Sequence, residues 1–186
     1  MSKKFQSVAP SSTLAITAKV NEMKANGINV VGFGAGEPDF NTPEHIREAA
    51  IKAINDGFTR YTPASGTKEL KKAVADKFQR ENGLSYGIEN IVISNGAKHS
   101  LMNALGVILN PGDEVIIPTP CWVSYPEMVK LNDGVPVLLK STEEEGFVVS
   151  AEKIASAITD KTRAVIINTP SNPTGMCYSE ELLREI

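Results

Sequence analysis

Short apolar runs separated by helical segments dominate the second half of the sequence and limit the folds open to it. The runs lie at residues 91–93, 115–117, 135–139 and 164–167. Runs of this length and composition indicate strands that are buried on both faces of a parallel sheet. A helical pattern at residues 101–109 separates the first two. This alternation predicts an α/β fold in which a mostly parallel sheet carries helices on both faces.

The last apolar run passes directly into a polar loop at residues 168–175, and a helical pattern follows from Ser179. Open α/β sheets bind ligands at such places, beyond the carboxyl ends of their strands. Pro170 and Pro173 fix their own φ angles, so we expect the side chain of Asn172 to be held in place. We also expect Asn172 to be buried, where its amide would suit a planar ligand bearing an oxygen substituent or a carboxylate.

The first apolar run leads into a turn at residues 94–100, where the next helical pattern begins. Free N–H groups and the positive end of the helix dipole make such a turn a candidate phosphate site. A plain strand-to-helix turn without a ligand is the commoner alternative. The triphosphate-binding pattern G-x-x-x-x-G-K-[ST] is absent, which weakens a nucleotide-binding interpretation.

The second apolar run ends in the loop 118–126, which holds Trp122, the only tryptophan of the sequence. An isolated tryptophan usually just packs against its neighbours. A flat indole can also stack on a heteroaromatic ring, and such pairs contribute about 0.5–1.5 kcal/mol beyond the burial of area. Both interpretations remain open on the sequence pattern alone.

The segment 30–40 begins as a short strand and then carries glycines at alternate positions, Gly32, Gly34 and Gly36. Such spacing lets a backbone pass close to another surface, and a tight crossover between subdomains is the simplest interpretation. It is not the G-x-G-x-x-G pattern of dinucleotide loops. A helix is predicted before it, ending at residues 26–27.

Two further helices are predicted after residue 40. Thr42 is the expected cap of the first, with a proline and a glutamate directly after it, and the helix should stop at residues 56–57. Thr67 is the expected cap of the second, which should end near residues 82–83. The loop between them is rich in proline and glycine and holds Tyr61, a residue that in most such loops simply packs its ring.

Composition excludes several classes of protein. The formal net charge is -3, no basic run is visible, and no apolar stretch approaches the roughly 20 residues that cross a bilayer. The N-terminus has no apolar segment typical of a signal peptide. Cys121 and Cys177 show no metal-binding or redox spacing. We therefore expect a cytoplasmic protein with two free thiols, without a metal site and without nucleic-acid or membrane partners.

Several of these stretches together resemble the class I pyridoxal-phosphate aminotransferases. The residues N-T-P-S-N-P-T-G at 168–175 are similar to the family signature Asn-Pro-x-Asn-Pro-Thr-Gly. G-A-G-E-P-D-F at 34–40 is similar to the family's segment beside the substrate, and Y-T-P-A-S-G at 61–66 matches its Tyr-x-Pro-x-x-Gly. Together with W-V-S-Y-P at 122–126, the segment 36–40 favours the subgroup of bacterial aspartate aminotransferases.

The resemblance implies pyridoxal 5'-phosphate as the cofactor. The phosphate would lie against Gly96, Ala97 and Lys98, with Lys98 contributing mainly its backbone N–H. Trp122 would stack on the cofactor ring and line the substrate site. Asn172 would serve both the ring oxygen and the α-carboxylate of the substrate.

Two more positions follow from the resemblance. Gly36 would contact the substrate through its backbone. Tyr61 would reach the cofactor phosphate of the partner subunit, which requires a homodimer. The family's Schiff-base lysine, pyridinium-binding aspartate and carboxylate-binding arginine lie downstream of residue 186, so we assign no catalytic residue within the chain.

The resemblance covers essentially the whole chain but only the first half of the family's length. It implies that residues 1–42 form an N-terminal arm and part of a small domain, and that residues 43–186 form the first half of the cofactor-binding large domain. The chain stops inside a helical pattern, and the family's later strands are missing. We therefore expect it to belong to a longer polypeptide or to be a partial form.

The implied activity is transfer of an amino group between an aspartate-like amino acid and a 2-oxo acid. Within the same fold, an aminotransferase for aromatic amino acids or alanine, or a carbon–sulfur lyase, remains open. From a different class, a non-catalytic fragment that keeps the architecture remains open as well. A nucleotide-binding α/β domain is the least favoured, because neither nucleotide fingerprint is present.

Overall fold

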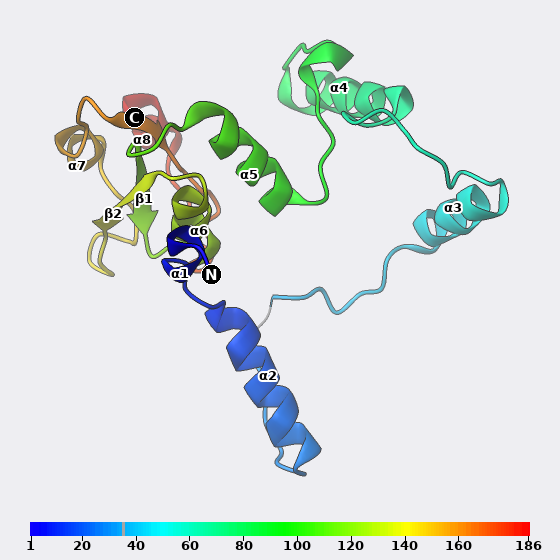
Figure 1. Ribbon diagram of the computed structural model, residues 1–186, viewed down its shortest axis with the longest axis horizontal. Coiled ribbons are helices and arrows are strands. Elements are labelled where there is room, and N and C mark those ends of the chain that lie inside the picture. The colour runs from blue at the N-terminus through cyan, green and yellow to red at the C-terminus, as the bar shows by residue number, and fades with distance from the viewer. Residues whose placement is uncertain (35) are drawn as a thin grey trace. The chain divides into compact units, whose positions relative to one another are not determined.

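The computed structural model describes residues 1–34 and 36–186 of the chain. They divide into two compact units, one made of residues 1–34 and 101–186 and the other of residues 36–100. The first unit contains a β-sheet with helices packed on it, and the second is built from helices and loops (Figure 1). No helix of the described residues is long and apolar enough to cross a membrane.

The sheet of the first unit is parallel, with the strand order β2-β1-β3. At its centre, Ile116 is aligned with Val137 on one side and Val165 on the other. The strands are β1 (Glu114–Thr119), β2 (Val135–Lys140) and β3 (Thr162–Val165). The parallel α/β fold expected from the apolar runs is confirmed. The last strand differs in extent, because it begins two residues before the run at 164–167 and ends at Val165.

The described part of the first unit also contains six helices. Ser11, Ser150 and Ser179 act as N-caps, each accepting a hydrogen bond from a backbone N–H in the first turn of its helix. The helices are α1 (Lys3–Gln6), α2 (Ser12–Ala25), α5 (Ala97–Ile108), α6 (Ser124–Leu131), α7 (Ala151–Ser156) and α8 (Glu180–Glu185). Of these, α6 and α7 connect the strands and α2 extends away from the sheet (Figure 1). The helix expected from Ser179 onward is confirmed as α8.

Successive residues of β1 point to opposite faces of the sheet and build a core on each. Val115 and Ile117 pack into one cluster with buried residues of α5 and α6, namely Leu105, Tyr125, Met128 and Val129. Ile116 packs into the other with Ile154 of α7 and with Val149, which precedes that helix. All three β1 residues are 0% exposed. Full burial of such side chains contributes about 1.5–3 kcal/mol each. β1 therefore contributes to the core on both faces of the sheet.

The second unit contains two helices and a short 3-10 turn. Thr67 caps the second helix as predicted, with its hydroxyl accepting a hydrogen bond from Leu70 N–H. The expectation that Thr42 caps the first is wrong: Pro43 holds the cap position, and its carbonyl accepts from the N–H groups of Ile46 and Arg47. The elements are α3 (Glu44–Asn55), α4 (Lys68–Asn82) and η1 (Ile88–Asn90).

Two predicted strands do not form. Residues 91–93 and the start of the segment 30–40 lie outside any strand of the described structure. A strand exists only when a neighbour accepts its hydrogen bonds. Ile93 N–H donates to the carbonyl of Ser65, which belongs to a loop, at 3.0 Å. Ile91 is nevertheless buried, so the apolar character of this run correctly indicated packing but not pairing.

Polar contacts fasten the N-terminal residues to α6 and the turn after it. Lys4 Nζ forms an ion pair with Asp133 at 2.6 Å. Glu127 accepts a hydrogen bond from Ala9 N–H at 3.0 Å, and Lys130 donates to the carbonyl of Ser7 at 3.4 Å. The N-terminal residues thus include the short helix α1, which is held against α6 and the turn after it.

The glycine spacing at residues 32–34 has a direct structural cause. A Cβ added at Gly34 would lie 2.5 Å from Cγ2 of Ile16, and one added at Gly32 would lie 3.2 Å from Cγ1 of Val20. Both partners are on α2. The backbone after α2 therefore runs back close to the helix, at a distance that excludes a side chain at Gly34 and leaves little room for one at Gly32. This is the close approach of a backbone to another surface that the glycine spacing predicted.

We expect Gly34→Ala to lower the free energy of unfolding by about 1–2 kcal/mol, because the added methyl group overpacks this contact. Ile16 cannot easily turn away, since a β-branched side chain in a helix has one strongly preferred rotamer. Gly36→Ala is the matched control, because its methyl group would meet nothing within 4 Å. Urea unfolding and amide exchange of residues 12–34 measure the difference. Equal losses in the two variants would contradict the close-approach explanation.

Asp113 shapes the turn that leads into β1. Its carboxylate accepts from Asn110 N–H at 2.8 Å and from the Asn110 amide at 3.2 Å, and Arg163 lies 3.4 Å away. These contacts, chiefly the Asn110 backbone N–H, hold the pKa of Asp113 below its ordinary value of 3.8. The folded state therefore favours the ionised form.

The sign of the pH effect follows from this lowered pKa. The stabilising contribution of Asp113 is present above the ordinary pKa and is lost as the pH falls through the lowered folded value. We expect Asp113→Asn to destabilise the protein at pH 7 and the deficit to shrink steadily below about pH 4. Urea midpoints of both proteins between pH 3 and pH 7 provide the measurement. A deficit that is constant over this range would show that the charge is not responsible.

Candidate functional site

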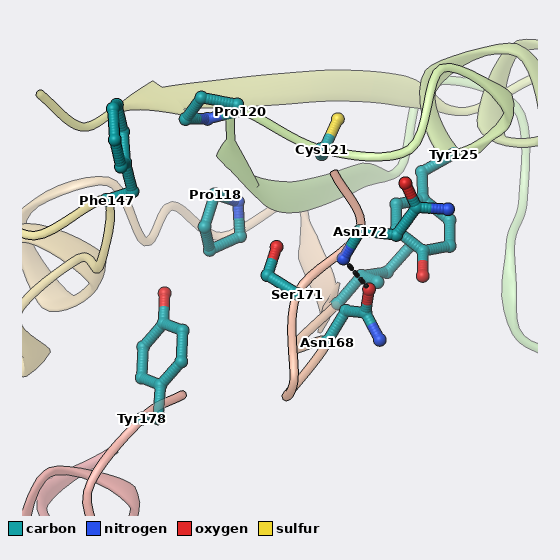
Figure 2. Close-up of a pocket in the computed structure, with 10 residues that line it drawn as sticks. Pro118, Pro120, Cys121, Tyr125, Phe147, Asn168, Ser171, Asn172 and Tyr178 are labelled. Carbon is teal, nitrogen blue, oxygen red and sulfur yellow. Dashed lines mark hydrogen bonds between the residues drawn. The ribbon is translucent and has the colours of Figure 1, made fainter. Parts of the chain in front are cut away.

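The loop after β3 is closed by hydrogen bonds of its own backbone and of one side chain. Asn168 Oδ1 accepts from Asn172 N–H at 2.8 Å (Figure 2). Ser171 N–H donates to the Met176 carbonyl at 2.8 Å, and Gly175 N–H donates to the Ser171 carbonyl at 2.7 Å. Gly175 has a φ of 74°, a left-handed conformation that glycine adopts without strain. The loop is therefore held in one shape, as expected from its sequence.

A small pocket lies at the carboxyl ends of β1 and β3, beside this loop (Figure 2). Its volume is about 20 Å³, which is room for about one water molecule. The lining residues are Pro118, Pro120, Cys121, Tyr125, Phe147, Ile166, Asn168, Ser171, Asn172 and Tyr178. The position agrees with the edge of the sheet at which the sequence placed a ligand site.

Asn172 lines this pocket but is exposed. The expectation that it would be buried is wrong. The reason is that the loop closes through the backbone of Asn172 and the side chain of Asn168, which leaves the Asn172 amide on the solvent side. An exposed amide on a fixed backbone remains available to a ligand that approaches from solvent.

Tyr178 joins the loop to the other face of the sheet. Its hydroxyl accepts a hydrogen bond from Val149 N–H at 3.2 Å, and its own N–H donates to Thr169 Oγ1 at 3.1 Å. Three residues that line the pocket, Asn168, Tyr125 and Tyr178, were not predicted from the sequence as site residues. For Asn168 a signal existed, because it is the first polar residue after a buried strand. Tyr178 carries no comparable signal.

Trp122 lies at the end of the loop that follows β1. Its ring meets that of Tyr125 edge to face, with centroids 5.4 Å apart and an interplanar angle of 89°. Trp122 is half-buried and packs against the core cluster around Val115. Part of the indole therefore serves packing, as the simpler interpretation held, and part remains accessible.

Two ionisable groups beside Trp122 are neutral near pH 7. Burial raises the pKa of the Cys121 thiol. Burial, and to a smaller extent the neighbouring Cys121, raises the pKa of the Tyr125 phenol. Neither residue offers an anionic base at neutral pH. This part of the site can therefore bind and orient a ligand, but these two groups do not supply a base.

Gly96, Ala97 and Lys98 lie in the second unit, at the beginning of α5, and all three are exposed. Gly96 has a φ of 81°, and a Cβ at this position would meet nothing within 4 Å. Gly96 N–H donates to the Ser94 carbonyl at 2.9 Å. The absence of a side chain at Gly96 leaves room at the beginning of the helix, a place that is chemically suited to an anion. The turn was expected to extend over residues 94–100 with a helix after it; this extent is wrong, because α5 already begins at Ala97.

Gly36 and Tyr61 belong to the second unit as well. Both are exposed, and Tyr61 lies in the loop between α3 and α4 with its side chain fully open to solvent. Among the predicted residues, the first unit brings Trp122 and Asn172 to the same end of the sheet, one in contact with Tyr125 and one lining a pocket with it. No group of three or more His, Cys, Asp or Glu residues suited to a metal ion occurs in the described part of the chain.

We expect Asn168→Ala to loosen the loop, because Asn172 N–H loses its acceptor. The loss of one such hydrogen bond costs about 1 kcal/mol. Asn168→Asp is the control, since an aspartate keeps an acceptor oxygen in the same place. Amide exchange of residues 169–177, measured by mass spectrometry, should accelerate in the alanine variant and change less in the aspartate variant. Identical exchange in wild type and Asn168→Ala would contradict this account of the loop.

Comparison with known proteins gives a consistent result. A family model described as aminotransferase class I and II matches residues 28–186. The chain is 55% identical to an aspartate aminotransferase of Bacillus sp. (strain YM-2), over 100% of this chain and 47% of that protein. It is 53% identical to the aspartate aminotransferase of Bacillus subtilis (strain 168), over 98% of this chain and 47% of that protein.

Solved structures agree with these matches. An aspartate aminotransferase from Thermus thermophilus with maleate superposes with a TM-score of 0.96 at 47% identity, covering 100% of this chain and 48% of that one. That from Rhizobium meliloti has a TM-score of 0.93 at 49% identity, covering 100% and 46%. The chain spans about half the length of the curated relatives it matches. Since the family model covers most of the sequence and the fold agrees throughout, the chain belongs to the aminotransferase class I and II family.

Proposed function

We propose that the polypeptide containing this chain transfers an amino group between an aspartate-like amino acid and a 2-oxo acid, with pyridoxal 5'-phosphate as cofactor. The observation that carries the proposal is the end of the sheet where Trp122 and Asn172 lie near Tyr125, in a chain of this family. Relatives at 55% and 53% identity are named aspartate aminotransferases, which supports the choice of substrate.

The described residues fit such a cofactor in their chemistry. The open, left-handed Gly96 at the beginning of α5 suits a phosphate, the accessible part of Trp122 suits a planar ring, and the exposed amide of Asn172 suits a ring oxygen. The pocket of about 20 Å³ is too small for a ring. A ring-sized ligand would therefore lie on the exposed side of the loop, where the Asn172 side chain is.

Each residue has a separate task in this proposal. Bound pyridoxal phosphate supplies an electron sink for the bonds of the amino acid. Gly96, Ala97 and Lys98 would hold the phosphate group, and Trp122 would keep the ring in its plane. Asn172 would orient the ring oxygen and the substrate α-carboxylate by hydrogen bonds.

Gly36 and Tyr61 are proposed to act from the second unit. Gly36 would present its backbone to the substrate, where the absence of a side chain leaves room. Tyr61 would donate its hydroxyl to the phosphate bound by a second copy in a homodimer. Its full exposure within the single chain supports a contact made outside that chain.

We also propose that residues 1–42 form an N-terminal arm and part of a small domain, and that residues 43–186 form the first half of the cofactor-binding large domain. We propose a cytoplasmic location as well, which the two free cysteines favour.

The test uses the whole polypeptide, with equilibrium dialysis against pyridoxal phosphate and transfer of ¹⁵N from aspartate to a 2-oxo acid. We expect binding and transfer in the wild type. Trp122→Ala should raise the dissociation constant of the cofactor by roughly threefold to tenfold, because stacking contributes about 0.5–1.5 kcal/mol. Trp122→Phe should have a smaller effect, since it keeps an aromatic ring.

Other outcomes select among the alternatives. Cofactor binding with transfer only from aromatic amino acids or alanine would replace the proposed substrate. Release of a thiol and a 2-oxo acid from a sulfur amino acid, without transfer, would indicate a lyase. Neither binding nor transfer would favour a non-catalytic protein, and thermal stabilisation by a nucleotide instead would favour the nucleotide-binding alternative.

A further inference from the structure

The turn before α5 is closed by a histidine side chain. Asn95 N–H donates a hydrogen bond to Nδ1 of His99 at 3.2 Å. Within the same turn, Gly96 N–H donates to the Ser94 carbonyl at 2.9 Å. The carbonyl of Gly96 accepts from the N–H groups of His99 and Ser100 at 3.1 and 3.3 Å. The ring of His99, which lies on the helix, therefore holds the N–H of Asn95. Asn95 is the residue directly before the left-handed Gly96.

This contact does what a capping side chain usually does, because it accepts a hydrogen bond from a backbone N–H at the start of the helix. Helices commonly begin at a serine, threonine, asparagine or aspartate, and a glutamine or glutamate three residues later reaches back to a backbone N–H. Here the residue before α5 is Gly96, which has no side chain to cap with. His99 occupies the third position of the helix, and its ring provides the reaching-back acceptor.

The hydrogen bond links the turn to the helix. Nδ1 of His99 accepts from Asn95 N–H, so the residue before Gly96 is tied to the third residue of α5. The backbone on both sides of Gly96 is therefore held by contacts within this turn.

We propose that His99 is a positioning residue for the cofactor phosphate, acting through Asn95 and Gly96 rather than touching the phosphate itself. This inference rests on the proposed function, which places the phosphate against Gly96, Ala97 and Lys98. Holding the turn reduces the conformational freedom that the backbone would otherwise lose when an anion binds. The affinity for the phosphate group, and not for the ring of the cofactor, therefore depends on His99.

The test compares His99→Ala, His99→Gln and His45→Ala in the whole polypeptide. Glutamine keeps an acceptor that suits this helix position. His45 is the other histidine of the chain and is likewise exposed in the first turn of a helix, α3, which makes it a matched control. The ligands are pyridoxal phosphate, inorganic phosphate and phosphate-free pyridoxal, each measured by equilibrium dialysis or by competition.

We expect His99→Ala to raise the dissociation constants of pyridoxal phosphate and inorganic phosphate by roughly threefold to tenfold, the value of one hydrogen bond. The dissociation constant of pyridoxal should not change. His99→Gln should recover most of the loss, and His45→Ala should match the wild type. Amide exchange of Asn95 should accelerate in His99→Ala alone.

Three results would overturn the inference: unchanged phosphate affinity in His99→Ala, an equal loss for phosphate-free pyridoxal, or unchanged exchange of Asn95. A failure of the proposed function looks different, since the wild type itself would then bind no pyridoxal phosphate. The exchange of Asn95 and the affinity for inorganic phosphate still decide the role of His99 in that case.

Discussion

The first unit depends on one constraint: β1 is buried on both faces of the sheet and pairs with a strand on each side. Val115, Ile116 and Ile117 are fully buried, and β1 pairs with β2 on one side and β3 on the other. Since all three strands run parallel, their carboxyl ends lie at the same end of the sheet, where the loops that follow Thr119 of β1 and Val165 of β3 begin. The placement of Trp122 and Asn172 near Tyr125 is a consequence of this topology.

The sequence predicted the elements that depend on local patterns. Burial on both faces, expected for the apolar runs, holds for β1 but is wrong for β2, where Val135 and Leu138 are exposed. The apolar runs at 115–117 and 135–139, the cap at Thr67 and the helix from Ser179 all depend on patterns within a few residues. The prediction failed where a partner decides the outcome. Residues 91–93 have strand-forming side chains but no strand neighbour in the described structure, so they stay extended without pairing.

The candidate site shows the same division. Motifs pointed to Asn172 and Trp122 because both lie in loops that follow strands. They did not show that the side chain of Asn168 accepts a hydrogen bond from Asn172 N–H, or that the side chain of Tyr178 connects this loop to Val149. Both contacts join a side chain to a backbone N–H group, over four residues in the first case and 29 in the second. Such contacts depend on the folded path of the chain and have no periodicity in the sequence.

Magnitudes limit what these 186 residues can do by themselves. A ring stacked on Trp122 contributes about 0.5–1.5 kcal/mol, and a hydrogen bond to Asn172 contributes about 1 kcal/mol. The N-terminal end of the α5 dipole contributes about 1 kcal/mol to the binding of a phosphate. Their sum of about 3 kcal/mol is less than the roughly 4 kcal/mol of millimolar affinity. In our proposal, tight retention of the cofactor therefore requires groups that the resemblance places beyond residue 186, above all the lysine that bonds to it. The described half would align the ring and phosphate, and those groups would supply most of the binding free energy.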